Sequence, residues 1–214
     1  MPFYKVVFLS HNTKLYLWKI TESKDQLLQG IALRDASLGR LEKMKSESHK
    51  KGFLAIRKLL EHIDYSDFDL YYDANGKPHL KPQGCFVKNK YISISHSYDF
   101  SAVAISDVEI GIDVEILKEK TLKLAPRFMN VLHLDHLNLN EKIQKATIIW
   151  GIKESIFKIK NEKGISFPTH IFEARFLLLD KKTTAELRFN DKTEKFDIEF
   201  DVFDDYIFVC AFQK

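Results

Sequence analysis

Alternating apolar and polar positions predict β-strands in three parts of the chain. Near the N-terminus, two such runs flank a polar turn at residues 11–13, a pattern typical of a hairpin. Further runs occupy the middle of the chain, and the tail over residues 171–212 reads as three or four antiparallel strands. Before the tail, the expected strands span residues 5–9, 15–20, 91–95, 102–105 and 110–116.

Apolar residues that recur every three or four positions predict three helical stretches. The first spans about residues 21–44, with Gly30 and Gly39 interrupting its pattern. The second spans about residues 46–62 and has a clear apolar face. The third is the most regular and spans about residues 138–160.

The strands and helices follow one another in two blocks, each of which ends in several strands. This order predicts an α+β fold with two parts, residues 1–105 and 106–214. The boundary is expected near Ser106. Since no long linker rich in Gly, Ser or Pro separates the two parts, we expect them to pack directly against each other.

The composition is that of an ordinary globular protein, with 45% hydrophobic and 29% charged residues among 214. Cys85 and Cys210 lack the spacing of a zinc site or a redox motif, so both are expected to be reduced thiols in the core. The sequence has neither a run of about 20 apolar residues nor a signal-peptide pattern. It therefore predicts a cytoplasmic protein with no membrane segment.

The net charge of +3 is too small to indicate nucleic-acid binding, but the basic residues are unevenly distributed. One segment is locally positive, because it holds only Glu42 and Glu47 as acids. It is either an ordinary solvated helix surface or a surface that attracts phosphates or an acidic protein. Its basic residues are Arg40, Lys43, Lys45, Lys50, Lys51, Arg57 and Lys58.

Two carboxylates share a predicted strand in residues 111–115, which read GIDVE. Strand alternation places Asp113 and Glu115 on the same face. Gly111 permits another backbone or a ligand to approach closely. This pair either faces solvent or suits a hard cation such as Mg²⁺, which prefers carboxylates together with substrate phosphate oxygens.

The third predicted helix carries a second group of candidate residues. Trp150, Glu154 and Lys158 are successive neighbours along one strip of its surface. Glu154 and Lys158 alone would be read as a routine surface ion pair. Because tryptophan is seldom left in open solvent, Trp150 indicates that this strip meets another element.

Two further side chains could contact phosphate. Lys77 follows an Asn-Gly turn and precedes Pro78, which favours an extended backbone that presents the lysine. His96 follows a predicted strand, where a side chain can reach a binding site or simply satisfy nearby backbone groups. His96 could alternatively form a nucleophilic pair with a serine, but no Gly-x-Ser-x-Gly turn accompanies it.

A possible metal pair lies at His133 and His136, which flank Asp135. No third cluster of ligands supports a zinc site there. We therefore interpret both histidines as surface residues.

Four motifs, taken in order, are similar to those of one enzyme family. The chain resembles the 4′-phosphopantetheinyl transferases, and specifically their larger, Sfp-type branch. The likeness covers most of the chain between about residues 50 and 170, and the order and intervals of the motifs make it specific. The motifs are NGKP at residues 75–78, ISHS at 94–97, GIDVE at 111–115 and WGIKESIFK at 150–158.

The resemblance implies a monomer of two similar α/β halves related by a pseudo-twofold axis, with coenzyme A bound between them. It implies a magnesium ion held by Asp113, Glu115 and Glu154 together with the pyrophosphate of coenzyme A. It further implies contacts with coenzyme A. Those contacts fall on Lys51, Lys77, Pro78, Ser95, His96 and Lys158.

The implied reaction is attack by a serine hydroxyl of a carrier protein on the β-phosphorus of coenzyme A, with release of adenosine 3′,5′-bisphosphate. The resemblance assigns Glu154 as the base and Lys158 as the group that neutralises the leaving phosphate. The expected protein partner is an acidic acyl or peptidyl carrier protein, which the basic segment between Arg40 and Lys58 would attract electrostatically.

The chain departs from the family pattern at two places. Glu162 and Lys163 reduce the usual glycine-rich approach to Gly164, and Lys51 stands where relatives often have arginine, which binds phosphate through a planar fork. Two other functions stay open. One is a non-catalytic module that binds coenzyme A or a carrier protein, and the other is a magnesium-dependent hydrolase that uses water as the acceptor.

Overall fold

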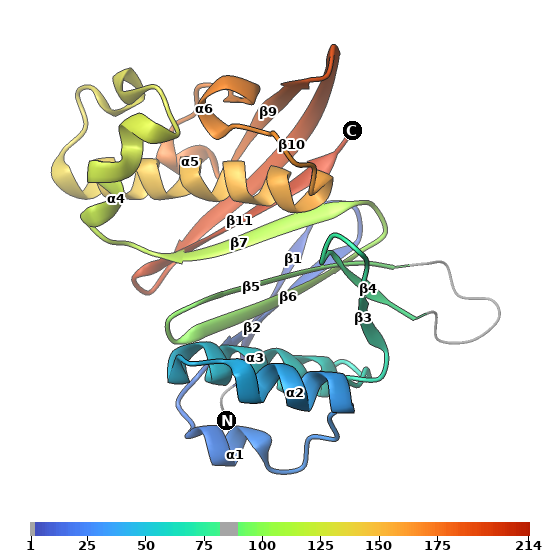
Figure 1. Ribbon diagram of the computed structural model, residues 1–214. Coiled ribbons are helices and arrows are strands. Elements are labelled where there is room, and N and C mark those ends of the chain that lie inside the picture. Colours follow the sequence, from blue (N-terminus) through green and yellow to red (C-terminus); the bar gives the residue numbers. More distant parts are fainter. Residues whose placement is uncertain (1–2, 82–89) are drawn as a thin grey trace. The chain divides into compact units, whose positions relative to one another are not determined.

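The structure is a computed structural model that describes residues 3–81 and 90–214. The chain divides into two compact units, residues 1–108 (unit 1) and 109–214 (unit 2). Each unit combines an antiparallel sheet with helices, so the fold is α+β (Figure 1). Within the described ranges, no helix is long and apolar enough to cross a membrane.

The main sheet of unit 1 has four antiparallel strands in the order β1-β2-β6-β5. Strands β1 and β2 form the predicted N-terminal hairpin, which is confirmed. Strands β5 and β6 form a second hairpin, which turns at Tyr98 with a φ of 48°. The bounds are Phe3–Leu9 for β1, Thr13–Lys19 for β2, Tyr91–Ser97 for β5 and Phe100–Ser106 for β6.

The predicted single helix over residues 21–44 is wrong, because two short helices take its place. Helix α1 spans Lys24–Leu28 and helix α2 spans Asp35–Lys43. Between them, Gln29 is extended and Gly30 adopts a φ of +81°, a left-handed conformation that interrupts a helix and that glycine adopts at low cost. The sequence signal at Gly30 therefore marked a true break.

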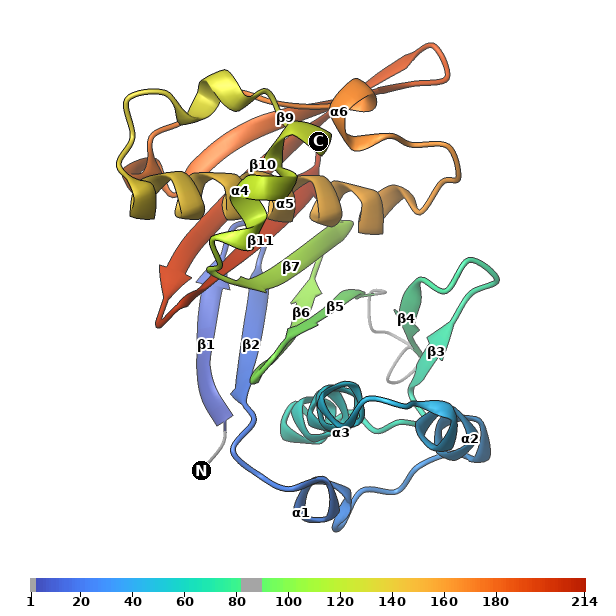
Figure 2. The ribbon, with the colours of Figure 1, turned by 60° about the vertical axis from the view of Figure 1, so that its left-hand side comes forward.

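Helix α3 spans Glu47–His62 and confirms the second predicted helix. The Ser46 side chain accepts a hydrogen bond from the backbone N–H of His49 and caps the helix start. Phe53, Ile56 and Leu60 of its apolar face are buried in the core of unit 1. In both views the helix runs alongside the four-stranded sheet (Figures 1 and 2).

A small hairpin, β3 (Leu70–Tyr72) with β4 (Pro78–Leu80), completes unit 1. Its turn is the predicted Asn-Gly turn, in which Gly76 has a φ of +83°. The Asp73 side chain accepts hydrogen bonds from the backbone N–H groups of Asn75 and Lys77. These bonds fix the loop from which Lys77 projects.

Unit 2 has a five-stranded antiparallel sheet in the order β7-β11-β10-β9-β8. The tail contributes four strands, in agreement with the expected three or four. Consecutive tail strands pair with each other, and β11 then pairs with β7 from the start of the unit. The bounds are Ile110–Ile116 for β7, Ile171–Glu173 for β8, Lys182–Phe189 for β9, Lys192–Phe203 for β10 and Tyr206–Gln213 for β11.

The long helix α5, Leu139–Lys160, confirms the third predicted helix and packs on β7 and β11 (Figure 1). Its start is a capping box, in which Asn138 and Glu141 exchange side-chain and backbone hydrogen bonds. Shorter helical segments surround it. They are α4 (Lys120–Leu124), η1 (Ala125–Arg127), η2 (Val131–Leu134), α6 (Phe167–His170) and η3 (Leu178–Asp180).

Each unit has its own hydrophobic core, and Cys210 lies on β11 within unit 2. Burial raises the pKa of the Cys210 thiol well above its ordinary value, and the charge of Glu199 raises it further. Cys210 is therefore a reduced, protonated core thiol, as predicted. Cys85, for which the same was expected, lies outside the described residues.

Candidate active site

Helix α5 and strand β7 make a very close contact at Gly111. A Cβ atom at this position would lie 1.9 Å from the carbonyl oxygen of Ser155 and 3.1 Å from Cγ1 of Ile159. Only glycine allows the helix backbone to approach this near. The glycine that begins the GIDVE motif thus sets the distance between the strand and the helix.

A second close contact lies one turn earlier on the helix. A Cβ atom at Gly151 would lie 2.7 Å from Cγ2 of Val209, on the neighbouring strand β11. The Ser155 hydroxyl also donates a hydrogen bond of 3.2 Å to the Val209 carbonyl oxygen. Two glycines and one hydroxyl therefore hold α5 against both β7 and β11.

This packing brings Asp113, Glu154 and Lys158 together. The Lys158 Nζ donates hydrogen bonds of 2.9 Å to Asp113 Oδ1 and 2.7 Å to the carbonyl oxygen of Ile112. The Asp113 side chain is only 6% exposed. Because Asp113 shares a strand face with Gly111, it points to the side covered by the helix.

Glu154 lies in the same electrostatic environment. Burial raises the pKa of Glu154, the negative charge of Asp113 raises it further, and the positive charge of Lys158 lowers it. Two carboxylates from different elements are therefore neighbours in a poorly solvated place, where additional positive charge would stabilise both ionised forms.

Glu115 is the third carboxylate that the sequence proposed. It is half-buried and, by strand alternation, shares the face of Asp113. Within the two described ranges, however, no group of three or more His, Cys, Asp or Glu side chains lies close enough to hold a metal ion. The three-carboxylate set of Asp113, Glu115 and Glu154 thus stays a prediction.

The residues present fit a magnesium ion that is bound together with a phosphorylated substrate. Mg²⁺ usually keeps several water ligands and takes one or two carboxylates plus substrate phosphate oxygens. Asp113 and Glu154 supply two such carboxylates, and the pKa of Glu154 is raised mainly by burial and further by the negative charge of Asp113. Both would hold the ion, with Glu115 as a possible additional ligand.

The predicted coenzyme contacts His96 and Ser95 lie on β5 in unit 1. The imidazole of His96 is exposed and meets the ring of His49 edge to face, with centroids 5.6 Å apart. Both rings line a pocket of about 340 Å³. A Cβ atom at Gly52, next to Lys51 on α3, would lie 2.7 Å from Cδ2 of His96, so this glycine makes room for the ring.

Lys77 and Pro78, the other predicted contacts in unit 1, lie on the β3–β4 hairpin. Lys77 is half-buried, and its backbone is held on both sides by Asp73. Pro78 begins β4 and pairs with Tyr72. The hairpin thus presents Lys77 from a rigid turn, as the sequence predicts, while its role in binding coenzyme A stays a prediction.

Comparison with known proteins places these motifs in a family. Residues 109–211 match the model of the 4′-phosphopantetheinyl transferase superfamily. The chain is 33% identical over 122 residues to the 4′-phosphopantetheinyl transferase psf-1 of Bacillus pumilus, which is 56% of this chain and 49% of that protein. It is 28% identical over 151 residues to the transferase Sfp of Bacillus subtilis (strain 168), which is 67% of this chain and 65% of that protein.

The match places residues 109–211 in the 4′-phosphopantetheinyl transferase superfamily. The transferase gsp of Aneurinibacillus migulanus is also similar, with 29% identity over 171 residues. The chain spans about half the length of psf-1, 49%, and 65% of Sfp, so these alignments leave part of each relative unmatched.

The lysine before Glu154 has a structural partner that the sequence patterns did not indicate. Lys153 is buried, and its Nζ donates hydrogen bonds to the carbonyl oxygen of Ile171 and to Oε2 of Glu173. Glu173 also lies 3.3 Å from Nδ1 of His133. Of the two histidines expected at the surface, His136 is exposed, while His133 is half-buried, with its side chain 17% exposed beside a buried carboxylate.

Trp150 meets other elements, as the sequence indicated. Its ring contacts Phe128, with centroids 5.1 Å apart, and Phe167, with centroids 5.5 Å apart. The tryptophan of the motif therefore anchors α5 in the core of unit 2. Its neighbour Glu154 stands on the part of the helix that faces β7.

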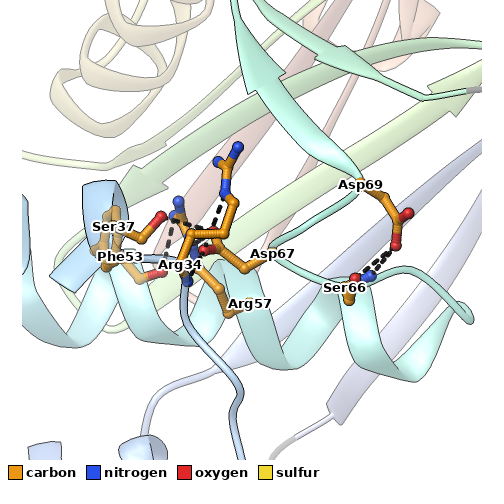
Figure 3. A network of polar contacts seen from close by, with 7 residues as sticks. All are labelled: Arg34, Ser37, Phe53, Arg57, Ser66, Asp67 and Asp69. Carbon is orange, nitrogen blue, oxygen red and sulfur yellow. Dashed lines mark hydrogen bonds and ion pairs between the residues drawn. The ribbon is translucent and has the colours of Figure 1, made fainter.

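A second buried carboxylate, Asp67 in unit 1, is the centre of a network of hydrogen bonds and ion pairs (Figure 3). Its oxygens accept hydrogen bonds from the Arg57 Nε at 3.0 Å, the Ser37 hydroxyl at 2.9 Å and the Arg34 backbone N–H at 2.9 Å. Arg57 also donates to the Phe53 carbonyl oxygen. The prediction of Arg57 as a surface cation is wrong, since its side chain is 2% exposed.

Proposed function

We propose that this protein transfers the 4′-phosphopantetheine group of coenzyme A to a serine of an acyl or peptidyl carrier protein. The observation that carries the proposal is the meeting of Asp113 and Glu154, with Lys158 beside them, at the contact between β7 and α5. The relatives psf-1, Sfp and gsp are 4′-phosphopantetheinyl transferases by name, which supports the same activity here.

The chemistry proposed for the chain's own residues is a proton transfer and a charge neutralisation. The carrier serine oxygen forms a bond to the β-phosphorus, while the bond from that phosphorus to the oxygen of the leaving adenosine 3′,5′-bisphosphate breaks. Glu154 accepts the serine proton, directly or through a water, and its raised pKa suits a base. Lys158 holds a positive charge next to the reacting phosphates.

When bound, a magnesium ion would neutralise the pyrophosphate oxygens and lower the barrier to attack. Asp113 and Glu154 are the residues proposed to hold it, with Glu115 as the third. Lys158, which donates a hydrogen bond to Asp113 Oδ1, orients that carboxylate.

In unit 1 we propose that His96, Ser95, Lys51, Lys77 and Pro78 contact the phosphates of coenzyme A. The exposed ring of His96 in a pocket of about 340 Å³ supports this assignment, because its donor is accessible to a ligand. Lys51 offers a point charge without the fork of an arginine, so its contact is expected to depend strongly on salt.

The test is to incubate the protein with coenzyme A, Mg²⁺ and a panel of unmodified carrier proteins, and to follow each carrier by intact-mass spectrometry. A transferase adds one phosphopantetheine group to at least one carrier, and a chelator stops the reaction. The carrier that reacts also assigns the pathway, whether fatty acid, polyketide or nonribosomal peptide synthesis.

Two results would contradict the proposal. Release of adenosine 3′,5′-bisphosphate at the same rate without any carrier would show a hydrolase. Coenzyme A binding without modification of any carrier in a broad panel would show a non-catalytic module. A carrier whose serine is replaced by alanine is the matched control for the acceptor.

A further inference from the structure

Unit 2 contains a pocket of about 640 Å³ that the proposed reaction does not use. Its walls come from η2 and the turn after it, from α5 and from residues 175–180. Ligand pockets in proteins commonly measure about 300 to 1,000 Å³, so its size suits a small molecule.

The pocket lies on the other side of α5 from the carboxylate pair. Lys145, which lines it, precedes Glu154 by nine residues in the same helix. At about 3.6 residues per turn, nine residues correspond to two and a half turns, so the two side chains leave the helix in opposite directions. The pocket is therefore separate from the candidate active site.

Lys145 places a buried positive charge in the pocket wall. The residue is 7% exposed, its Nζ donates a hydrogen bond to the carbonyl oxygen of Phe176, and the ring of Phe176 lies 3.5 Å from it. Burial lowers the pKa of Lys145, and the charges of Asp180 and Glu173 oppose this effect from a distance. In the part of the chain that the structure describes, no carboxylate lies within 4.0 Å of its Nζ.

An ammonium group can donate three hydrogen bonds, and a buried one is costly unless it is paired. Lys145 makes one such bond to a backbone oxygen among the described residues. A carboxylate that entered the pocket would add a negative charge in direct contact with this ammonium and accept a further hydrogen bond.

Apolar side chains form the rest of the pocket and its rim. Leu132 and Leu177 line it and are 66% and 71% exposed, and the adjacent Leu179 is 91% exposed. Exposed leucines gathered around a concave site are typical of a binding surface for an apolar group. They offer a place for a hydrocarbon chain next to the buried ammonium.

The remaining charges of the pocket limit how much negative charge a ligand can carry. Arg175 adds a second cation, but Asp135 and Asp180 also line the pocket. The Asp180 carboxylate accepts a hydrogen bond from the backbone N–H of Leu177, which fixes it within the wall. His133 and His136 line the pocket as well. Because Asp135 and Asp180 would repel a highly charged anion, a single carboxylate is favoured over a polyanion such as coenzyme A.

We propose that this pocket binds an amphipathic monocarboxylate, with its carboxylate paired to Lys145 and its apolar chain against Leu132 and Leu177. The inference goes beyond the proposed transfer activity and does not depend on it. The ligand class is an aliphatic acid whose chain is long enough to cover the exposed leucines.

The test is calorimetric titration of the full chain with decanoate below its micelle concentration. We expect one decanoate per chain, and binding weakened at least about tenfold in Lys145→Met, since a hydrogen bond between charged groups contributes a factor of this order. Lys142→Met is the matched control, because Lys142 is on the same helix and does not line the pocket. Decanol, which lacks the charge, should bind at least about tenfold more weakly than decanoate.

Lys145→Met removes a buried charge and keeps the chain length, so it should fold, which a thermal melt verifies. Leu177→Asp alters an exposed residue and should weaken decanoate binding without affecting the fold. The proposal is overturned if decanoate does not bind, if it binds Lys145→Met as tightly as the wild type, or if excess coenzyme A displaces it.

Discussion

Asp67 in unit 1 is buried and Glu154 in unit 2 is half-buried, and the pKa values of these two carboxylates are shifted in opposite directions. Burial alone would raise the pKa of Asp67, but hydrogen bonds from Arg34 and Ser37 and the charge of Arg57 outweigh it and lower the pKa. Burial raises the pKa of Glu154, the negative charge of Asp113 raises it further, and Lys158 only partly opposes the shift. Burial acts on both groups in the same direction, so the donors and cations around Asp67 are what make the difference.

This difference separates a structural centre from a reactive one. The oxygens of Asp67 are supplied with donors from three residues, so the group contributes to stability and has little capacity left for a ligand. In the Asp113–Glu154 pair, Lys158 forms an ion pair with Asp113, and the pKa of Glu154 is still raised by burial and by the charge of Asp113. A shifted pKa of this kind is common at functional sites, where residues are placed for catalysis or binding rather than for stability.

The largest expected effect is on the structural centre. Asp67→Ala leaves the buried guanidinium of Arg57 without its carboxylate, which should lower the free energy of unfolding by about 3 to 5 kcal/mol. Urea titration of the purified variant measures this change. A loss below about 1 kcal/mol would show that the Asp67 network is not a stabilising centre.

The next effect concerns the contact that positions the reactive pair. Gly111→Ala would place a methyl group against the Ser155 carbonyl oxygen, and the resulting overpacking should cost about 1 to 3 kcal/mol of unfolding free energy. Gly39→Ala in α2 is the matched control, since nothing lies within 4 Å of its Cβ position and alanine favours a helix. Equal stability of the two variants in urea would refute the close packing of α5 on β7.

A smaller effect with the opposite sign is expected at the reactive centre. Glu154→Gln removes a carboxylate whose ionised form is disfavoured by burial and by the charge of Asp113, so the free energy of unfolding should be unchanged or rise by less than about 1 kcal/mol. The same urea titration measures it. If Glu154→Gln lowered the free energy of unfolding as much as Asp67→Ala does, Glu154 would be a stabilising residue like Asp67, and the proposed difference between the two sites would be wrong.

The smallest effects are in the pH dependence of stability. The folded-state pKa of Asp67 is lowered, so its contribution is complete above its ordinary value of 3.8 and is lost as the pH falls through the folded value. The folded-state pKa of Glu154 is raised, so its contribution is complete below its ordinary value of 4.5 and is lost as the pH rises through the folded value.

Unfolding free energies of the wild type, Asp67→Asn and Glu154→Gln between about pH 3 and 7 test these signs. The deficit of Asp67→Asn should shrink toward acid pH. The advantage of Glu154→Gln should grow above about pH 4.5. If the unfolding free energies of both variants changed with pH in parallel with the wild type, the pKa shifts assigned to Asp67 and Glu154 would be contradicted.

The sequence was most informative where local patterns decide the structure. The capping box at Asn138, the turn at Gly76 and the period of α3 each act over a few residues, so they could be recognised directly. The break at Gly30 was visible as a glycine, but its effect was underestimated because the apolar period continues beyond it.

The site was less accessible to residue patterns alone. Asp113 and Glu154 are far apart in the sequence, and their pairing was inferred from a family resemblance. The partners of Lys153 and Arg57 were missed, because a hydropathy pattern predicts that a cation is exposed. It cannot show that Glu173 packs beside Lys153 or that Asp67 packs beside Arg57.

The most direct test of the central claim is the rate at which Glu154→Gln modifies a carrier protein, measured by intact-mass spectrometry with coenzyme A and Mg²⁺. The exposed Glu162→Gln, just beyond α5, is the matched control. We predict at least about a hundredfold slower modification for Glu154→Gln and an unchanged rate for Glu162→Gln. Undiminished modification by Glu154→Gln would contradict the assignment of the Asp113–Glu154 pair as the reactive centre.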